Sequence, residues 1–589
     1  MPVSCKEMIL SDDYADWIID FELTEELQAL DKNNVEYCAR QIDRGLGLVF
    51  AKRNQMEPIG LLNYAYQRLP NLLGLQEITT DSIGGSFDNT PLFSSGILQV
   101  QQAPLNLSGK GTIIAFLDTG IDYQNPVFRK EDGSSRILAI WDQTIQEGEP
   151  PQGFEYGTEY TREEINRALQ EESPFSIVPS KDENGHGTLV ASVAAGSKLQ
   201  QGTLFNGAAP QADILVIKLK ECKKYLRDYY LVPEKVPAYQ ATDIMMALEY
   251  ADGFARSFFQ PVIFCIALGS SYGSHSGTSP LSAYINRLAN KRSRIFVVGG
   301  GNEGNTAHHY EGNLSPINGR EEEIKEEIEI RVGEKEGGFI TEIWGQSPNI
   351  FSLAIRSPGG EEVPNAGIKS NRGIEYRFVY EETMITVSYA LVEGNSGDEL
   401  ITVRFQNPTE GIWTLILESE SGLQNADFHV WLPITEFLSS ETYFLSPNPD
   451  ITLTIPSYAE NAVTVSSYSD KTNSFYVRSG RGFSRGSLRK PDVSAPAVGI
   501  SAALRGIGNE LRVRKVSGAA MAAAITAGGV ANFMQWAVVD GNVNYLNSAE
   551  VKNYLIRGAV RDDNLTYPNR LWGFGKLSIQ GIFDSLAKL

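Results

Sequence analysis

The sequence is short of basic residues. Its 589 residues include 72 Asp plus Glu against 51 Lys plus Arg, which gives a formal net charge of −21. A nucleic-acid partner would need a clustered basic surface, so this balance argues against one. An acidic surface that keeps a large protein dissolved is the simpler interpretation.

Cysteine is scarce as well. Cys5, Cys38, Cys222 and Cys265 are far apart and form no CxxC pair. This spacing predicts neither a zinc site nor a disulfide framework. We therefore expect no metal and no cofactor.

Targeting signals and long apolar runs are also missing. The first residues, MPVSCKEMILSDD, carry charge within ten positions and lack the basic segment and long apolar run of a secretory signal. No apolar run reaches the length of a membrane span. We expect a protein that is made in the cytosol and has no membrane span.

The patterns that are present divide the chain into four parts. Residues 1–95 predict a small α+β unit, with a strand over 46–54, a helix over 58–75 that Pro70 interrupts, and an exposed linker over 79–96. Residues 96–309 and 453–589 alternate apolar runs with helical stretches, which is typical of buried parallel strands. Residues 310–452 show short alternating segments and predict an all-β jelly roll or sandwich. The fold class is therefore α/β, a doubly wound parallel sheet with an N-terminal α+β unit and an inserted all-β domain.

Three polar residues stand where such a sheet presents catalytic groups, beyond the carboxyl ends of its strands. Asp118 ends the run GTIIAFLD, where a carboxylate can orient a histidine; a helix cap, a turn or an aspartic-protease nucleophile are the alternatives, but the chain has no second DTG or DSG. His186 opens a small-residue helix in NGHGTLVASVAAGS; a structural histidine is the alternative, but a catalytic role is favoured because HGT follows the strand-end Asp118 in chain order. Asn302 follows SRIFVVGGG, where its amide can donate to an oxyanion or simply form the turn.

A fourth element, SGAAMAAAITAGG at 517–529, begins a helix of very small side chains. Asp118, then His186, then this helix follow the chain order of the catalytic groups in subtilisin. Together the segments resemble the subtilisin-like serine proteases. That family usually has GTSMAAP here, whereas this chain has Ala519 for the Thr and Ala520 for the nucleophilic Ser. Alanine has no oxygen, so no acyl-enzyme can form at Ala520.

The resemblance covers about residues 95–305 and 455–585, including CIALGSSYGSHSG (265–277) and KPDVSAP (490–496). It implies that residues 1–95 are a prodomain, an intramolecular chaperone and inhibitor. The tail of a prodomain lies in the cleft, so processing is expected near 88–99. The roles that the resemblance implies for single residues are a catalytic set of Asp118, His186 and Ala520, an oxyanion donor in Asn302, and peptide contacts from Leu268, Gly269 and Gly301.

Three further features narrow the resemblance to one group within the family. A prodomain without a secretory signal, a β insert, and the stretch SGILQVQQAPLNLSGKGTIIAFLDTGIDY resemble the Csp proteases of spore-forming clostridia. In that family the insert is a jelly roll that rigidifies the enzyme, and active members cleave the pro-form of a cortex-lytic hydrolase during germination. Other members are pseudoproteases that regulate germination or sense germinants. The resemblance implies a location in the spore coat or cortex and, as partners, the chain's own prodomain, that pro-hydrolase and other Csp proteins.

Three hypotheses stay open. The first is a Csp-type protease whose serine has been replaced, because Asp118, His186 and Asn302 are all present. The second is a natural pseudoprotease, because Ala519 also departs from the family motif. The third is a serine hydrolase that uses Ser271 of GSSYG, although that elbow should lead into a helix and YGSHSGTSP is loop-like.

Overall fold

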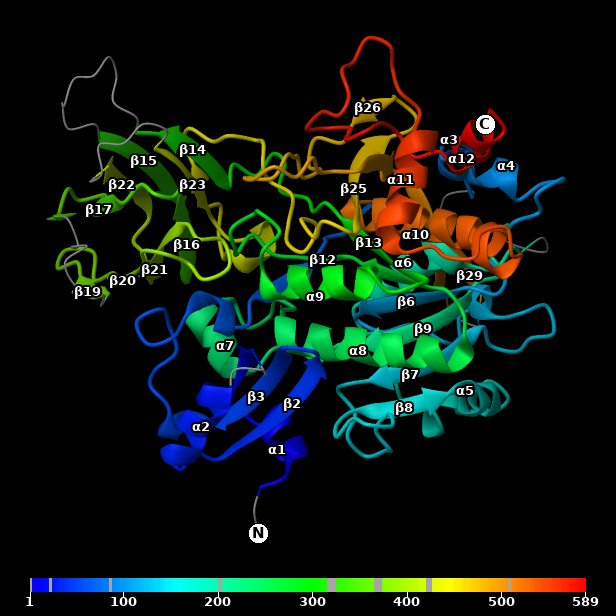
Figure 1. The fold of residues 1–589 in the computed structure, drawn as a ribbon, viewed down its shortest axis with the longest axis horizontal. Helices are drawn as coiled ribbons and strands as arrows, with labels where there is room; N and C mark the ends of the chain where they lie inside the picture. The colour runs from blue at the N-terminus through cyan, green and yellow to red at the C-terminus, as the bar shows by residue number, and fades with distance from the viewer. Residues whose placement is uncertain are drawn as a thin grey trace.

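The structure, a computed structural model, describes residues 3–20, 24–83, 87–199, 204–314, 325–364, 373–419, 426–506 and 510–588. A nine-stranded sheet forms its centre (Figure 1). The inner strands are parallel, and β8 and β26 add antiparallel edges. Across the sheet the strands follow the order β26 (Ser474–Phe475), β25 (Val463–Ser469), β13 (Arg294–Gly299), β11 (Val262–Ile266), β6 (Ile113–Asp118), β9 (Asp213–Lys218), β7 (Ile137–Asp142) and β8 (Thr158–Thr161). The ninth strand, β27 (Val493–Pro496), pairs with β25.

Helices cover both faces of this sheet. α6 (His186–Ala195) and α10 (Ala519–Met534) pack on one face, and α8 (Ala241–Phe258) and α9 (Pro280–Ala289) on the other. The segment Ala519–Val539 is long and apolar enough for a membrane span, contrary to the prediction, but most of it is buried in the protein core. Further α-helices of the central domain and of the segment that leads into it are α3 (Thr90–Ser94), α4 (Ile97–Val100), α5 (Arg162–Ala168), α7 (Lys224–Tyr230), α11 (Ser548–Gly558) and α12 (Ile579–Leu586).

The N-terminal unit is a small antiparallel sheet that lies beside α8 (Figure 1). Met8, Ile18 and Phe50 join the same core as α8 and α9, so the unit is packed onto the central domain. Its strands run in the order β1-β3-β2. Its elements are α1 (Cys5–Leu10), β1 (Tyr14–Ile19), α2 (Thr24–Lys32), β2 (Tyr37–Asp43) and β3 (Leu46–Lys52).

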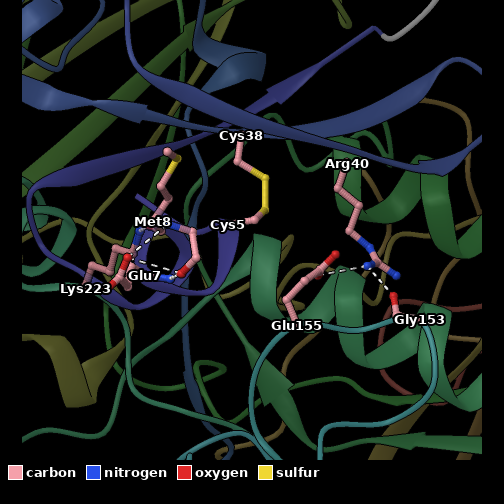
Figure 2. Close-up of a disulfide and its surroundings, with 9 residues drawn as sticks. Cys5, Glu7, Met8, Cys38, Arg40, Gly153, Glu155 and Lys223 are labelled. Atoms are coloured by element: carbon pink, nitrogen blue, oxygen red, sulfur yellow. Dashed lines mark hydrogen bonds and ion pairs between the residues drawn. A yellow bond between two sulfur atoms is a disulfide. The ribbon is translucent and has the colours of Figure 1, made fainter. Parts of the chain in front are cut away.

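A disulfide joins Cys5 of α1 to Cys38 of β2, so the prediction that the cysteines form no disulfide was wrong (Figure 2). The two residues are 33 positions apart, and only the folding of α1 onto β2 brings their Cα atoms to 5.5 Å. Figure 2 shows contacts to the central domain on both sides of the disulfide. Lys223 Nζ donates to the Met8 carbonyl at 2.8 Å, and Arg40 donates to the Gly153 carbonyl at 2.6 Å.

The chain between residues 58 and 83 differs from the predicted helix and linker. It forms turns, a 3-10 turn at Tyr66–Arg68, and the strands β4 (Leu72–Leu75) and β5 (Thr79–Ile83). β4 lies between β10 (Tyr239–Gln240) and β12 (Leu268–Gly269), and β5 pairs with β29 (Leu511–Ser517), which also pairs with β28 (Ile500–Arg505). The helix fails because Pro70 interrupts it, because Gly60 has a non-helical φ of +147°, and because distant strands supply partners for an extended backbone.

The insert consists of two antiparallel sheets over a shared apolar core that includes Phe339, Trp413 and Phe428. This is the architecture that the alternating segments predict. One sheet holds β14 (His309–Asn313), β23 (Asp427–Trp431), β16 (Gly338–Gly345), β21 (Glu399–Gln406), β20 (Met384–Ala390) and β19 (Ile374–Arg377). The other holds β18 (Glu362–Val363), β17 (Phe351–Arg356), β22 (Gly411–Ser419), β15 (Lys325–Val332) and β24 (Tyr443–Phe444).

Candidate active site

Asp118 and His186 meet at the carboxyl edge of the central sheet. Asp118 is the last residue of β6, and His186 is the first residue of α6. Both side chains are buried, and Nδ1 of His186 lies 2.8 Å and 2.9 Å from the two Asp118 carboxylate oxygens. Burial lowers the pKa of His186, but the Asp118 carboxylate, the Gln76 carbonyl and Asp182 act together in the opposite direction, and the pKa is raised. This arrangement orients an imidazole so that its Nε2 can accept and return a proton.

A glycine and a buried polar network hold α6 against Asp118. A Cβ on Gly187 would lie 2.2 Å from the Gly120 carbonyl oxygen and 3.1 Å from Asp118 Cβ, so glycine is required for this approach. Thr119 Oγ1 accepts a hydrogen bond from Gly187 N at 3.0 Å and donates to Asp182 at 2.7 Å. The sequence reasoning missed Thr119 and Asp182, because their roles depend on the fold.

Asn302 and the start of α10 lie at the same edge of the sheet. Asn302 Oδ1 accepts from Ala519 N at 3.0 Å, which leaves Nδ2 to donate to the Glu77 carbonyl at 3.0 Å. Ala520 is the second residue of α10 and is fully buried. The site therefore brings together an imidazole, a carboxylate that orients it and a side-chain amide donor, but position 520 has no side-chain oxygen that could act as a nucleophile.

The chain's own residues 72–77 occupy the cleft. Leu75 and Gly74 of β4 pair with Leu268 and Gly269 of β12, in the antiparallel register of a peptide that adds a strand to a sheet edge. The prediction of a cleft segment near 88–99 was wrong. Residues 90–100 form α3 and α4, and the Ser95 carbonyl accepts from Ile579 N at the start of α12.

Gln76 fills a pocket beside the histidine. Its side chain is buried, and its amide donates to the Gly299 carbonyl at 2.6 Å. Its backbone N donates to the Ala267 carbonyl at 2.9 Å. Its carbonyl oxygen lies 3.0 Å from Nε2 of His186. The side chain of Gln76 therefore fills the pocket, and its backbone carbonyl faces the imidazole of His186.

The three residues predicted to bind peptide divide into two groups. Leu268 and Gly269 lie in β12 against the cleft strand. Gly301 instead accepts from Gly480 N at 2.9 Å through its carbonyl. Gly299 makes the peptide contact, since a Cβ there would lie 2.0 Å from Gln76 Oε1. Nothing in the run of glycines at 299–301 marks which of them touches the peptide.

The Glu77 carbonyl reaches the start of α10. A Cβ on Gly518 would lie 2.4 Å from this oxygen, and Gly518 has a φ of +149°, so both space and backbone conformation favour glycine. The Glu77 carboxylate accepts from Arg478 at 2.6 Å. Two successive carbonyls, of Gln76 and Glu77, therefore face the histidine and the amide donor.

Ser271, the nucleophile of the third hypothesis, is buried in a loop, and the next helix begins only at Pro280. His275 contacts the Ser271 backbone carbonyl at 3.0 Å rather than the hydroxyl. Within the described ranges, no three His, Cys, Asp or Glu side chains gather as metal ligands would. The geometry gives a Ser271 hydrolase no support.

Comparison with known proteins places the fold. Residues 109–318 and 441–575, together more than half of the 589 residues, match the model of the Subtilase family, and the gap between them lies within the insert. Two Arabidopsis thaliana proteins are similar, the subtilisin-like proteases SBT3.1 (30% identity over 161 residues, 25% of this chain) and SBT2.2 (32% over 135 residues, 20% of this chain). The matches span 20% and 16% of those relatives' length.

The solved structure of the Clostridium perfringens CspB protease is similar over 85% of this chain and 98% of that chain, with a TM-score of 0.74 and 29% identity. The predicted fold is confirmed: a subtilisin-like parallel sheet, a small N-terminal sheet and an antiparallel β insert. On the family match and this likeness, the chain belongs to the subtilase family.

Proposed function

We propose that this chain has the framework of a Csp-type subtilisin-like serine endopeptidase of spore germination, and that Ala520 prevents it from cutting peptides. The main support for this proposal is the peptide strand that occupies the cleft. Residues 72–76 lie there as a substrate strand would, and the Gln76 carbonyl stands 3.0 Å from His186 Nε2. The bond that a complete site would cut is therefore Gln76–Glu77.

With serine at position 520, the reaction follows from the geometry. The hydroxyl oxygen would add to the Gln76 carbonyl carbon while His186 takes the proton, and Asp118 would stabilise the imidazolium. The Gln76 oxygen would turn from His186 to Asn302, whose amide now donates to Glu77. His186 would then protonate the Glu77 nitrogen as the bond breaks, and water would release the acyl group.

The proposed natural substrate is the pro-form of a spore cortex-lytic hydrolase, in the spore coat or cortex. The likeness to the CspB protease supports this class. Because the Gln76 side chain is buried in its pocket, we expect the substrate to have Gln directly before the cleaved bond. The processed Ala520→Ser protein should shorten such a pro-hydrolase at a glutamine, and no shortening would contradict this substrate.

A second candidate is a natural pseudoprotease that binds partners without cutting them. Two adjacent positions, Ala519 and Ala520, depart from the family motif, and the cleft still holds a peptide strand. Under this proposal the residues around position 520 have changed as well, so Ala520→Ser alone would not restore cleavage.

Restoring the serine separates the two candidates. The Ala520→Ser chain should break into two polypeptides on a denaturing gel, and Ala520→Ser/His186→Ala should stay whole because it lacks the base. If both Ala520→Ser and Ala519→Thr/Ala520→Ser stay whole, the protease framework is contradicted and the pseudoprotease is favoured.

A further inference from the structure

We propose that Arg478 selects an acidic residue directly after the cleaved bond, so that the substrates form a class of peptides with Glu or Asp at that position. The inference rests on the proposed function, which assigns Gln76–Glu77 as the bond. Arg478 Nη2 donates to Glu77 Oε2 at 2.6 Å. The exposed fractions of the two side chains are 25% for Arg478 and 46% for Glu77.

The backbone around Arg478 is built onto the turn that carries Asn302. Gly304 N donates to the Arg478 carbonyl at 2.9 Å, and Gly480 N donates to the Gly301 carbonyl at 2.9 Å. These bonds hold residues 478–480 against both sides of Asn302. The guanidinium therefore starts from a position fixed relative to the amide donor, on the leaving-group side of the bond.

The positive charge of Arg478 is available to pair with an acidic residue of the peptide. Glu436 is another acidic group whose charge acts on Arg478. Burial together with the Glu303 carboxylate raises the pKa of Glu436 to about 8. While Glu77 is in place, Glu436 is therefore mostly uncharged at neutral pH, and the ion pair of Arg478 is the one with Glu77. When the segment after the cut leaves the cleft, Arg478 has no other ion-pair partner among the described residues.

A plain surface ion pair is the competing explanation, because exposed pairs contribute little. Its usual cost is the ordering of two flexible side chains. Here the Glu77 backbone is already ordered, since the preceding Gln76 side chain is buried in its pocket and the Glu77 carbonyl is bonded to Asn302. Charge recognition next to a fixed peptide strand discriminates between substrates more strongly than an isolated pair would.

The test uses the full chain with Ala520→Ser and measures the rate of self-cleavage. Arg478→Glu and Glu77→Arg should each slow cleavage at least about fivefold, because like charges then meet. The double variant Arg478→Glu/Glu77→Arg restores the attraction and should recover most of the rate. Arg489→Glu is the matched control, because Arg489 is exposed and stacks on Phe483 outside the cleft.

Each outcome decides the inference. If Ala520→Ser cuts and the two charge reversals leave the rate unchanged, or if the double variant shows the product of the two defects, Arg478 does not select the residue. If Ala520→Ser does not cut at all, the proposed function fails. The inference is then tested by a double-mutant cycle at positions 77 and 478 in the Ala520 chain, measured by urea unfolding midpoints. If the midpoints show no coupling between the two positions, the inference is overturned.

Discussion

Some residues of the cleft have side chains that can take part in a reaction, and others are glycines that allow close approach of neighbouring backbone. Asp118, His186 and Asn302 belong to the first kind, and Gly187 and Gly518 to the second. Replacing serine by alanine removes one oxygen and leaves the small volume of α10 unchanged. Every contact that positions the Gln76 carbonyl can therefore exist in a chain that cannot cut it.

The first prediction concerns the pocket for Gln76. In the Ala520→Ser background, Gln76→Glu should slow self-cleavage about 10- to 100-fold at pH 7.5, because a carboxylate would meet the Gly299 and Leu268 carbonyls at the positions that now lie 2.6 Å and 3.5 Å from the amide. A gel time course measures this. Gln99→Glu makes the same charge change away from the cleft and should cut at the parent rate. Equal rates for both variants would contradict the assignment of the pocket.

The sequence motifs at strand ends and helix starts pointed to Asp118, His186, Asn302 and Ala520, which lie at one edge of the sheet. It did not predict Gln76, Glu77 or Arg478. Gln76 meets Leu268 from 192 residues away, and Arg478 lies 401 residues from Glu77. No local pattern marks a residue whose role comes from a segment that crosses the cleft.

Among the elements, the β insert forms part of the cleft. Ile434 and Phe437, just after β23, cover Gly74 of the cleft strand. A Cβ on Gly74 would lie 2.5 Å from Ile434 Cδ1 and 3.2 Å from Phe437 Cε1. Glu342 of β16 accepts from Tyr66 Oη at 2.7 Å and from Gly273 N at 2.8 Å, which links the insert, the segment before β4 and the loop after β12.

The second prediction tests this cover. Gly74→Ala should lower the stability of the uncut chain by about 1–3 kcal/mol, because the added methyl group overpacks the contact with Ile434. Ile434→Val removes the Cδ1 atom that the methyl group meets, so Gly74→Ala/Ile434→Val should be more stable than the sum of the two single changes predicts. Urea unfolding midpoints measure this, and strictly additive losses would show that the insert does not cover Gly74.

Element prediction succeeded where one period dominates a long stretch. The apolar runs of the parallel sheet and the alternating strands of the insert are such stretches. It failed over 58–83, where the turns and the strands β4 and β5 carry apolar residues without a clear period. There the partners of the strand, β10 and β12, decide the conformation.

Across the whole molecule, three buried histidines lie where the insert meets the central domain. His275 stacks on Trp431 with ring centroids 4.0 Å apart, and His309 Nε2 lies 3.0 Å from His429 Nδ1. Burial lowers the pKa of His275 and of His309 to about 3, and that of His429 well below its usual range. The positive charge of Arg485 lowers the pKa of His275 and of His429 further.

The third prediction is acid destabilisation at this interface. Histidine has a pKa of about 6.5 in the unfolded chain, so its stabilising contribution is complete above pH 6.5 and is lost as the pH falls toward 3. Three such groups give a slope of up to about 4 kcal/mol per pH unit. His275→Phe keeps a ring on Trp431 and should reduce the loss of stability between pH 6.5 and 5.5 by about 1 kcal/mol, toward a limit of about 1.4 kcal/mol per unit at lower pH.

Urea unfolding at pH 7.5, 6.5 and 5.5 measures both slopes. Other buried groups affect the parent and the His275→Phe chain alike, so the difference between the two chains isolates His275. Identical slopes would show that His275 is not held neutral at the interface.

The proposed function depends on which bond lies in the cleft beside His186. Mass spectrometry of the N-terminal fragment released by the Ala520→Ser chain tests this most directly. We predict a fragment that ends at Gln76 and a second polypeptide that begins at Glu77. A fragment that ends between residues 88 and 99, or a chain that stays whole, would contradict the account.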